Sequence, residues 1–522
     1  MLQPILTDSS DFTEIRRKNC IYVDKTAYFH KLITENNVLF FLSRPRRFGK
    51  SLMISTLKAI FEGRRELFDG LAISCTDWKW ETYPVLHFNF GFAARSSAKE
   101  FQCSLPIEVE HGIIAAGGNY NHNWLVADNF GNAIKSLSAA NGGKGVVILI
   151  DEYDDPVARL LDKPDDAEKV RGILADFYSQ MKDRTGDIRF LMITGVSKFT
   201  KMSVFSALSN LTDLSLQDDY ATMLGFTEDE LDRYFNDHLH THAEKMGLPY
   251  ADYRAELKRW FNGYRFGRTI PTTVYNPVSI GINLSEQNAF FKSSWSETGK
   301  ASMMMNYLKR NDFLSIDMDG IQDVNELDFD VSDIRNLHAV PMLFQAGYLT
   351  IADFSIATKR FSLRVPDAEV RQDLAALMTS VGAKQDAYWV SQLGGHLLSA
   401  RWSEFFTGLK SLYAALPYGP SENVQEYSFE RNLLVLLWSQ AVQCTTEDRQ
   451  ANGQADIVAI HPAGIFIFEL KVDESADTAL KQVKEKKYDA PYHGRNLPIW
   501  LLGLNFDRQT HHLLDAKTEK LA

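Results

Sequence analysis

The 522-residue sequence contains few cysteines and no long hydrophobic run. Its 4 cysteines lie far apart, with no CxxC pair and no cluster with histidine, which excludes a disulfide framework and a structural zinc site and favours a reducing cytoplasm. No stretch of about 18 uncharged apolar residues occurs, so we expect neither a membrane span nor a membrane partner. The first residues, MLQPILTDSSDF, lack a basic segment followed by an apolar one, so we expect no export signal.

The sequence also lacks an excess of positive charge, because its 67 acidic residues outnumber the 56 lysines and arginines and give a formal net charge of −11. On average the chain repels a polyanion, so any binding of nucleic acid requires local basic patches. The hydrophobic fraction of 45% and the charged fraction of 24% are those of an ordinary globular protein, which excludes collagen-like, coiled-coil and disordered classes. The length exceeds what one hydrophobic core covers, so we expect about three domains.

Three regions with different patterns follow one another, without internal repeats. Over residues 1–220, short apolar runs alternate with helical stretches, which predicts a parallel α/β sheet with crossover helices. Residues 221–420 are mainly helical in pattern. Residues 421–522 follow the linker-like LPYGP and predict a small, separate α/β module. The strand-like runs of the first region are residues 38–42, 85–90, 146–150 and 190–193.

The middle region contains two recognisable elements. Thr227 followed by Glu230 is a capping-box signal, which predicts a helix start. The runs 348–353 and 361–365 predict a hairpin after an apolar segment, an order that resembles a winged-helix unit. Such a hairpin either contacts the backbone of a nucleic-acid duplex or packs within its own domain. Its basic residues are Lys359, Arg360 and Arg364.

An apolar strand, a loop and an amphipathic helix follow one another in VLFFLSRPRRFGKSLMISTLKAIF. In a phosphate-binding loop, N–H groups at the helix start, a lysine and a hydroxyl bind the phosphates and Mg²⁺. Gly49 permits the tight backbone, Lys50 reaches the β- and γ-phosphates, and Ser51 binds the metal. The residues expected to bind nucleotide here are Arg47, Phe48, Gly49, Lys50, Ser51 and Leu52.

The position five residues before Gly49 is usually glycine in this motif, but here it is Arg44. Another residue is compatible with phosphate binding if its φ angle stays negative. Alternatively, Arg46 and Arg47 occupy the phosphate pocket or add contacts to phosphate. The sequence leaves these interpretations open.

A second element, KGVVILIDEYDDP, places two acids at the end of an apolar strand. A buried parallel strand delivers its last side chains to the same sheet edge as the loop. Asp151 is therefore expected to hold Mg²⁺ and Glu152 to activate the attacking water as general base, unless both only cap a turn. A third strand, FLMITG, brings Thr194 and the nearby Ser197 to this edge. Either hydroxyl is suited to orient the γ-phosphate or the attacking water. The alternative is that each is only a hydroxyl in the turn that ends the strand.

The third constellation is NGQADIVAIHPAGIFIFELKV, which predicts a hairpin with acids on both strands. Side chains alternate along a strand, so Glu469 and Lys471 share a face, and Asp456 faces them across the pair. Two carboxylates and the carbonyl of Leu470 are ligands that Mg²⁺ prefers, and an adjacent lysine positions or deprotonates water. This arrangement predicts metal-assisted phosphodiester cleavage. The alternative is a surface ion pair between Glu469 and Lys471.

Helices are expected on both sides of this hairpin. The helix before it carries Glu430, which adds a carboxylate from outside the sheet, and Gln482 opens the helix after Lys471. The expected order of elements is helix 429–440, strands 455–460 and 465–470, helix 478–488 and strand 498–504.

Several of these tracts resemble the AAA-ATPase-like proteins of bacteria and archaea. They are YVDKT, RPRRFGKS, LIDEYD and TGVSKFTKMSVFSALSNLTDL, with WFNGYRFG and VYNPVSI resembling the helical segment that follows in that family. The resemblance covers nearly the whole chain. It implies a P-loop domain of AAA or STAND type with a helical lid, in a family that tolerates RPRRFGK in place of a glycine-rich start. Asp24, Arg265 and Asn276 match motif positions to which we assign no role.

The C-terminal pattern resembles the PD-(D/E)XK nuclease superfamily, in the version fused to AAA-like domains. The resemblance implies that Asp456 and Glu469 bind metal and that Lys471 is the catalytic lysine. It also implies that Glu430 and Gln482 support the site.

Together the patterns favour a protein that binds and hydrolyses ATP and whose Mg²⁺-dependent C-terminal module cleaves nucleic acid, with DNA favoured over RNA. Self-assembly into a homo-oligomer is compatible with this class, in which a neighbouring subunit often supplies an arginine finger. Two alternatives remain open. One is a STAND-type switch for signalling or assembly whose C-terminal module recognises without cleaving, and the other is a scaffold in which Arg44 blocks phosphate binding. The sequence identifies no protein partner.

Overall fold

The computed structural model describes residues 2–198, 208, 210–285, 291–293, 320–329, 339–416, 426–450 and 453–521. They form two compact units. The first holds the described residues up to 293 and those from 320 to Asp367, and the second holds the described residues from Ala368 onward. The division into three domains stays a prediction. No helix in the described part of the chain has both the length and the apolar character that a membrane crossing requires.

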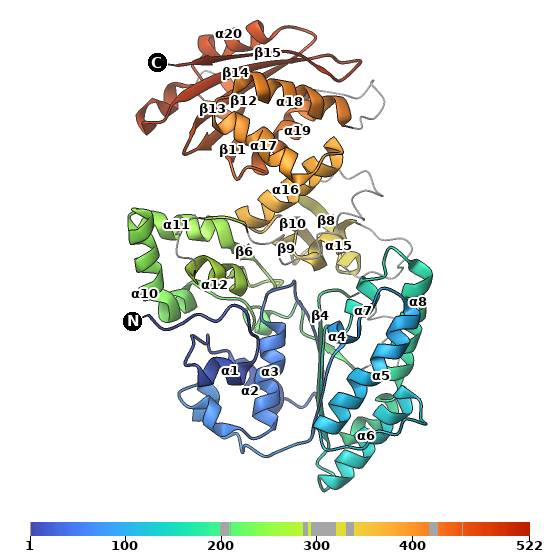
Figure 1. The fold of residues 1–522 in the computed structure, drawn as a ribbon. Helices are drawn as coiled ribbons and strands as arrows, with labels where there is room; N and C mark the ends of the chain where they lie inside the picture. The colour runs from blue at the N-terminus through green and yellow to red at the C-terminus, as the bar shows by residue number, and fades with distance from the viewer. Residues whose placement is uncertain are drawn as a thin grey trace. The chain divides into compact units, whose positions relative to one another are not determined.

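The first unit is built on a five-stranded sheet whose strands all run parallel. Figure 1 shows this sheet edge-on, with helices on both sides of it. In order across the sheet, the strands are β2 (Val85–Asn89), β3 (Val146–Asp151), β4 (Ile188–Gly195), β1 (Leu39–Ser43) and β5 (Thr212–Asp213). β1 and β3 are buried along their whole length, because helices cover both faces of the sheet. The predicted parallel α/β fold is confirmed.

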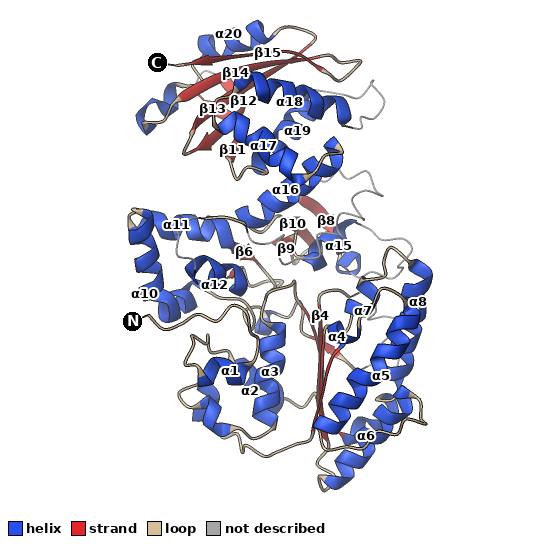
Figure 2. Ribbon diagram, viewed as in Figure 1, coloured by secondary structure: helices blue, strands red, loops and turns tan. Residues whose placement is uncertain are grey.

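The helices divide between the two faces of this sheet (Figure 2). On one face lie α1 (Phe12–Arg17), α2 (Thr26–Thr34) and α3 (Lys50–Phe61). On the other lie α4 (Phe90–Ala93), α5 (Ala98–Ala115), α6 (Val126–Ala140), α7 (Asp155–Ala158) and α8 (Pro164–Ser179). Aromatic rings close the core on this second face, where Phe130 and Phe177 stack at 4.1 Å between ring centroids and both contact Phe88 of β2.

A helical segment follows the sheet, as the sequence predicts. It contains α10 (Glu228–Met246), α11 (Tyr250–Phe261) and α12 (Pro277–Ser285), with the paired strands β6 (Asn262–Tyr264) and β7 (Val274–Tyr275) between the last two helices. The capping box is confirmed. The Thr227 hydroxyl accepts a hydrogen bond from the Glu230 N–H, and the Glu230 carboxylate accepts one from the Thr227 N–H.

The predicted hairpin is confirmed as β9 (Thr350–Ser355) and β10 (Arg360–Arg364), which follow α15 (Ala339–Ala346). A third strand, β8 (Ile321–Val324), pairs with β10. The sequence analysis did not predict β8, because the short tract IQDV shows no clear alternation.

Two of the three basic hairpin residues are engaged inside the first unit. Arg360 donates to the carbonyl of Asp323 at 3.3 Å, and Arg364 donates to the carbonyl of Gly263 at 3.5 Å. These contacts favour packing within the unit over binding of a duplex backbone.

In the described part of the second unit, four helices precede a five-stranded mixed sheet in the sequence. The helices are α16 (Ala368–Ala383), α17 (Ala387–Leu398), α18 (Trp402–Ala415) and α19 (Glu426–Trp438). In order, the strands are β11 (Gln443–Gln450), β12 (Gly453–His461), β13 (Gly464–Val472), β14 (Ile499–Phe506) and β15 (Leu513–Lys520). β13 and β14 run parallel, and α20 (Ala476–Lys486) is the crossover between them.

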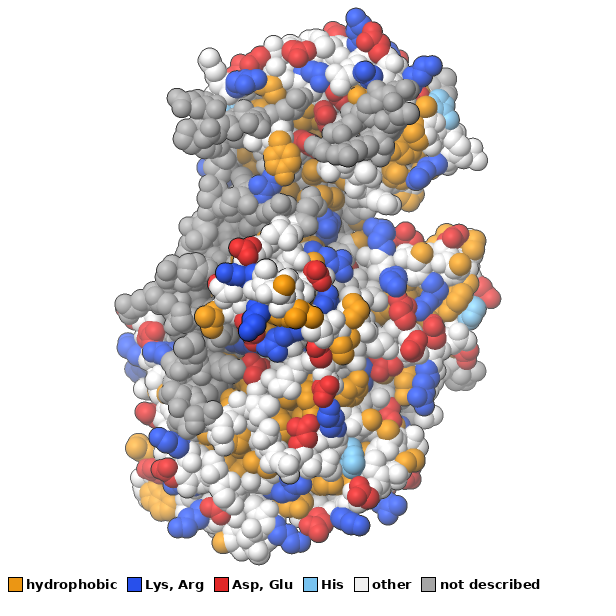
Figure 3. Space-filling view, turned by 180° about the vertical axis from the view of Figure 1, so that it is seen from behind, with side chains coloured by type: hydrophobic (Ala, Val, Ile, Leu, Met, Phe, Trp, Pro, Cys, Tyr) orange, Lys and Arg blue, Asp and Glu red, His pale blue; other side chains and the backbone are white. Residues whose placement is uncertain are grey.

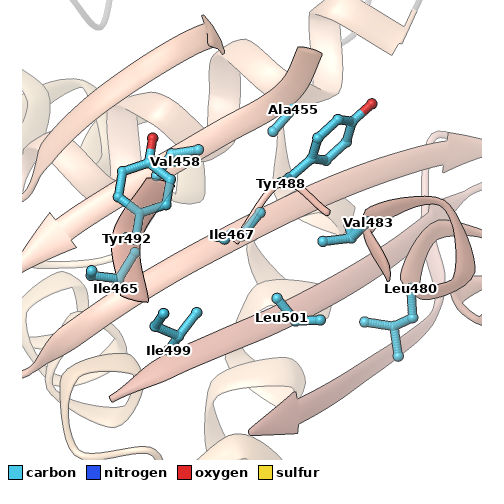
Figure 4. Packing of buried hydrophobic residues seen from close by; sticks show 10 residues of the cluster. All are labelled: Ala455, Val458, Ile465, Ile467, Leu480, Val483, Tyr488, Tyr492, Ile499 and Leu501. Atoms are coloured by element: carbon cyan, nitrogen blue, oxygen red, sulfur yellow. The ribbon is translucent and has the colours of Figure 1, made fainter. Parts of the chain in front are cut away.

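The core under α20 shows how this crossover is held (Figure 4). Leu480 and Val483 of α20 pack with Ile467 and Leu501 from the two parallel strands. Gly503 permits this close approach, since a Cβ there would lie 2.3 Å from the carbonyl oxygen of Ala476.

Short 3-10 turns complete the two units. They are η1 (Arg65–Phe68), η2 (Ala72–Cys75), η3 (Lys182–Asp187), η4 (Asp218–Tyr220), η6 (Glu326–Phe329) and η8 (Ala490–Arg495).

Candidate functional sites

The loop between β1 and α3 has the geometry of an anion site. Gly49 adopts φ 84° and immediately precedes α3, and no side chain caps the helix, so its first N–H groups are available to a phosphate. Ser51 and Leu52 lie in the first turn of α3 and are half-buried. The sequence motif and the local fold therefore agree.

Lys50 is folded back over this loop. Its Nζ donates to the carbonyl oxygens of Arg44 at 2.9 Å and Pro45 at 2.8 Å. Burial lowers the pKa of Lys50 to about 8, although the nearby carboxylates of Asp151 and Asp154 favour the charged form. A bound phosphate would add a further negative charge beside this buried ammonium and favour its charged form.

Arg44 does not need glycine's conformational freedom. The described loop residues with positive φ are Arg47, at 69°, and Gly49, whereas Arg44 is not among them. The Arg44 side chain is 1% exposed and donates to the carbonyls of Ser215 at 2.6 Å and Ser43 at 3.0 Å. These carbonyls hold the guanidinium, and the interpretation in which Arg44 blocks phosphate binding stays an open alternative.

Asp151 and Thr194 meet at the carboxyl ends of β3 and β4. Asp151 is 1% exposed, and its Oδ1 accepts hydrogen bonds from the Thr194 hydroxyl at 2.6 Å and from the Glu152 N–H at 3.0 Å. Thr194 therefore orients the Asp151 carboxylate, whereas the sequence analysis expected it to orient phosphate or water directly.

Asp154 is a buried acid that the sequence analysis missed. It accepts hydrogen bonds from the Ser197 hydroxyl at 2.5 Å and from the Ser197 N–H at 2.7 Å, so Ser197 is likewise tied to a carboxylate. Burial raises the pKa of Asp154. The acid-rich tract DEYDDP signalled several carboxylates, but the pattern does not say which of them turn inward.

Glu152 points toward Gly91 in α4, the short helix that directly follows the neighbouring strand β2. A Cβ built on Gly91 would lie 1.7 Å from Glu152 Oε2, so the carboxylate occupies the space that any larger residue at position 91 would need. Burial, followed by the charges of Asp155 and Asp151, raises the pKa of Glu152. A carboxylate with a raised pKa is suited to accept a proton from water.

Arg46 lies at the rim of the same site. It is about one third exposed, and its guanidinium is 3.4 Å from Asp155, which also binds Arg159 at 2.7 Å. The Arg46 side chain therefore forms an ion pair with Asp155, an acid that follows β3.

A cavity beside the loop was not predicted. It encloses about 170 Å³ between the loop, the N-terminal segment and the start of the helical segment. Its walls are mainly apolar, as a nucleoside base requires. The residues that line it include Ile5, Leu6, Thr7, Tyr22, Val23, Arg47, Phe48, Gly49, Leu52, Met223, Leu224, Phe226, Pro277 and Gly281. Periodicity gave no signal for it, because its walls come from segments far apart in the sequence.

The YVDKT tract lies against this cavity. Asp24 Oδ1 accepts from the Thr26 N–H at 2.9 Å, and its Oδ2 accepts from the Ala72 N–H at 2.7 Å, so Asp24 is a turn residue. Lys25 lines the cavity and binds the Glu230 carboxylate at 2.6 Å. Because Glu230 also closes the capping box, Lys25 connects the cavity wall to the start of α10.

The second site lies on β12 and β13. In their antiparallel register Ile457 is opposite Phe468, which places Asp456 across from Glu469. Asp456 Oδ2 accepts a hydrogen bond from the Leu470 N–H at 2.7 Å. The predicted hairpin thus brings both acids to one face.

Lys471 completes this second site. Its Nζ lies 2.9 Å from Glu469 Oε1 and donates to the Leu470 carbonyl at 2.9 Å. The Glu469 side chain is 1% exposed and that of Lys471 is 13% exposed, so the interpretation as a surface ion pair is wrong. The Lys471 ammonium lies next to the buried Glu469 carboxylate and compensates its charge. Two carboxylates and one carbonyl are a set of oxygen ligands that fits Mg²⁺.

Glu430 and Gln482 have different surroundings. Glu430 lies in α19 and is buried, and Gln482 lies in α20 and is half-buried. Gln482 does not open this helix, which begins at Ala476 after the N-cap Ser475. In the described residues no three His, Cys, Asp or Glu side chains gather closely enough to hold a metal, so a supporting role for Glu430 stays a prediction.

Comparison with known proteins identifies the domains that carry the two candidate sites. Residues 7–205 match the family described as Predicted AAA-ATPase, and residues 425–515 match the PD-(D/E)XK nuclease superfamily. The chain is also 32% identical over 528 residues to a protein from Azotobacter chroococcum mcd 1 called "Uncharacterized protein in vnfD 5'region", with 98% of each chain covered. No solved structure matches the chain.

The chain therefore belongs to the AAA-ATPase-like proteins, in the form that carries a C-terminal PD-(D/E)XK nuclease superfamily domain. This confirms the resemblance in both parts of the chain.

Proposed function

We propose that this protein binds and hydrolyses ATP with Mg²⁺ and that its C-terminal domain uses Mg²⁺ to cleave nucleic acid, DNA in preference to RNA. The observation that carries the first half is the meeting of the Lys50 loop with Asp151 and Glu152 at one edge of a parallel sheet. A base in the adjacent cavity and phosphates at the start of α3 would be contiguous, since Gly49 and Leu52 border both.

The side chains of the first site have separable roles in this proposal. Lys50 binds the β- and γ-phosphates, and Glu152 accepts a proton from the attacking water. Ser51 and Asp151 would hold Mg²⁺, which when bound neutralises charge on the phosphates. Thr194 acts through Asp151 by fixing its carboxylate.

In the second site, Asp456, Glu469 and the Leu470 carbonyl would hold Mg²⁺, which when bound supplies Lewis acidity to a phosphodiester. Lys471 positions or deprotonates the water. Figure 3 shows basic and acidic side chains interspersed on one face. Because no broad basic surface is seen there, binding of nucleic acid on this face would depend on a small local group of cations. Assembly into a homo-oligomer and location in the cytoplasm remain predictions.

Replacing Lys50 with alanine tests the nucleotide half. We expect the affinity for ATP with Mg²⁺ to fall at least about tenfold, because the buried ammonium is the cation nearest the phosphates. The matched control is Lys58→Ala, which removes a half-exposed lysine from the same helix. Titration calorimetry with the full chain measures both, and equal affinities for the two variants would contradict the proposal.

Replacing Gly281 with leucine tests the assignment of the cavity. A Cβ there already meets Thr7 Cγ2 at 3.0 Å, so a leucine side chain enters the space between α12 and the N-terminal segment. We expect about tenfold weaker ATP binding, with a melting temperature a few degrees lower because the new side chain presses on Thr7. Gly172→Leu is the control, because it also replaces a helical glycine but has nothing within 4 Å. Similar affinities in the two variants would exclude the cavity as the base site.

Cleavage is tested on single-stranded DNA, double-stranded DNA and RNA, with and without ATP. The proposal expects cleavage that depends on Mg²⁺ and changes with ATP. ATP binding without cleavage of any polymer, together with ATP-dependent oligomerisation, would instead favour the nucleotide switch.

A further inference from the structure

The tract NGYRFG lies beneath the phosphate loop, although the sequence assigned it no role. Phe48, the residue before Gly49, packs edge-on against Tyr264 at 4.7 Å and against Phe266 at 5.2 Å between ring centroids. All three side chains are at most 5% exposed. Two aromatic rings from outside the sheet therefore hold the end of the loop.

The beginning of the loop rests on the same tract. The Arg44 guanidinium lies 4.1 Å from the centroid of the Phe266 ring, with the charge over the ring. Phe266 thus contacts the loop at both its first and its fifth residue, Arg44 and Phe48. Between them, the carbonyl of Arg46 accepts a hydrogen bond from the Asn276 side chain at 3.5 Å.

These contacts surround a loop that holds a non-glycine residue in a left-handed conformation. The six residues 44–49 contain one glycine, and Arg47 adopts a left-handed conformation that favours glycine. Such a backbone persists only where its surroundings hold it. Here the surroundings are the aromatic pair, the Arg44 guanidinium and Asn276.

We propose that Tyr264 and Phe266 are positioning residues for the nucleotide, because they hold Phe48 and Arg44 so that the loop keeps the shape that binds phosphate. The expected effect of these residues on ATP binding rests on the proposed function. Their expected effect on the shape of the loop does not depend on it. The aromatic clamp, defined as Tyr264 and Phe266, supports the loop on both sides of Arg47, the non-glycine loop residue with positive φ.

The clamp is anchored on its far side. The Tyr264 hydroxyl donates to the Gly347 carbonyl at 2.8 Å, and the Arg265 N–H donates to the Thr350 hydroxyl at 2.8 Å. The buried Arg265 guanidinium donates to the Ala352 carbonyl at 3.1 Å. Arg265 therefore ties the clamp to β9, which explains why an arginine in this tract is buried.

The test compares Phe266→Leu with Phe130→Leu in the full chain. Both variants replace a buried phenylalanine of the first unit by a similar apolar side chain, but Phe130 packs on Phe88 and Phe177, away from the loop. We expect Phe266→Leu to weaken ATP binding about tenfold more than Phe130→Leu. Phe266→Tyr keeps the ring and is expected to restore affinity to within about twofold. Equal affinities in Phe266→Leu and Phe130→Leu would overturn the proposal.

Hydrogen exchange gives a second measurement that needs no nucleotide. Without ATP, the amides of residues 44–49 are expected to exchange faster in Phe266→Leu than in Phe130→Leu, with Tyr264→Phe close to the natural protein because its ring remains. If the natural protein binds no ATP but the loop amides respond in this way, the proposed function fails and the clamp stands. If ATP binds and neither the amides nor the affinity respond to Phe266→Leu, the clamp fails and the proposed function stands.

Discussion

Replacing Glu152 with glutamine is expected to lower the rate of ATP hydrolysis at least about a hundredfold while leaving ATP affinity within about twofold. Glutamine keeps the shape of the side chain but does not accept the proton from water. The raised pKa of Glu152, which burial and two neighbouring acids cause, is what makes the carboxylate a usable base. Single-turnover phosphate release measures the rate, and unchanged hydrolysis would remove Glu152 from the mechanism.

A second variant changes the position of this carboxylate without changing its chemistry. Alanine at position 91 would place its Cβ 1.7 Å from Glu152 Oε2, so the flexible end of Glu152 must move. We expect Gly91→Ala to reduce hydrolysis at least about tenfold with the fold intact. Gly186→Ala, with nothing within 4 Å, is the matched control. Equal rates in these two glycine variants would show that the orientation of Glu152 does not matter.

Replacing Asp456 with asparagine is expected to reduce nucleic-acid cleavage at least about a hundredfold, with ATP hydrolysis unchanged. Asparagine can still accept the Leu470 N–H, so the hairpin keeps its hydrogen bond while the site loses one negative charge. The measurement is the cleavage rate on the polymer that the natural protein cuts, at saturating Mg²⁺.

Asp515→Asn is the control for Asp456→Asn. Asp515 also accepts a backbone N–H, that of Ala476 at 3.0 Å, and it lies on the same sheet in β15. We expect its cleavage rate to stay within about twofold of the natural protein. Full activity in Asp456→Asn, or equal losses in the two variants, would contradict a metal-binding role for Asp456.

The sheet and the places of the candidate site residues on it could be predicted, because burial and side-chain chemistry leave short-range signals in the sequence. Strands covered on both faces are continuous apolar runs, as β1 and β3 are, and the residues that follow such strands must lie at one sheet edge. The second site was predictable for a related reason. A hairpin's alternation determines which of its acids share a face, and the β12–β13 register confirms it.

What the sequence did not reveal depends on long-range contacts or on weak patterns. The cavity wall joins Ile5 to Pro277, and Asp154 reaches Ser197, contacts that periodicity cannot indicate. The edge strands β11 and β15 were also missed, because QCTTEDRQ and LLDAKTEK are rich in polar residues. The helix that contains Gln482 was predicted to begin at residue 478, but it begins at Ala476, so Gln482 lies farther from the helix start than predicted.

The helix α18 determines where the chain can be divided for separate study of the C-terminal domain. Trp402 of this helix packs against Trp500 at 4.8 Å between ring centroids, and Tyr413 packs against Phe506 at 4.7 Å. A fragment that begins at residue 421, or at the start of the family match, would leave this aromatic face of the sheet in water and invite aggregation. A fragment that begins at Ala368 keeps this face covered. If the shorter fragment is inactive, its exposed aromatic face is a sufficient reason, and the result says nothing about the chemistry of Asp456, Glu469 and Lys471.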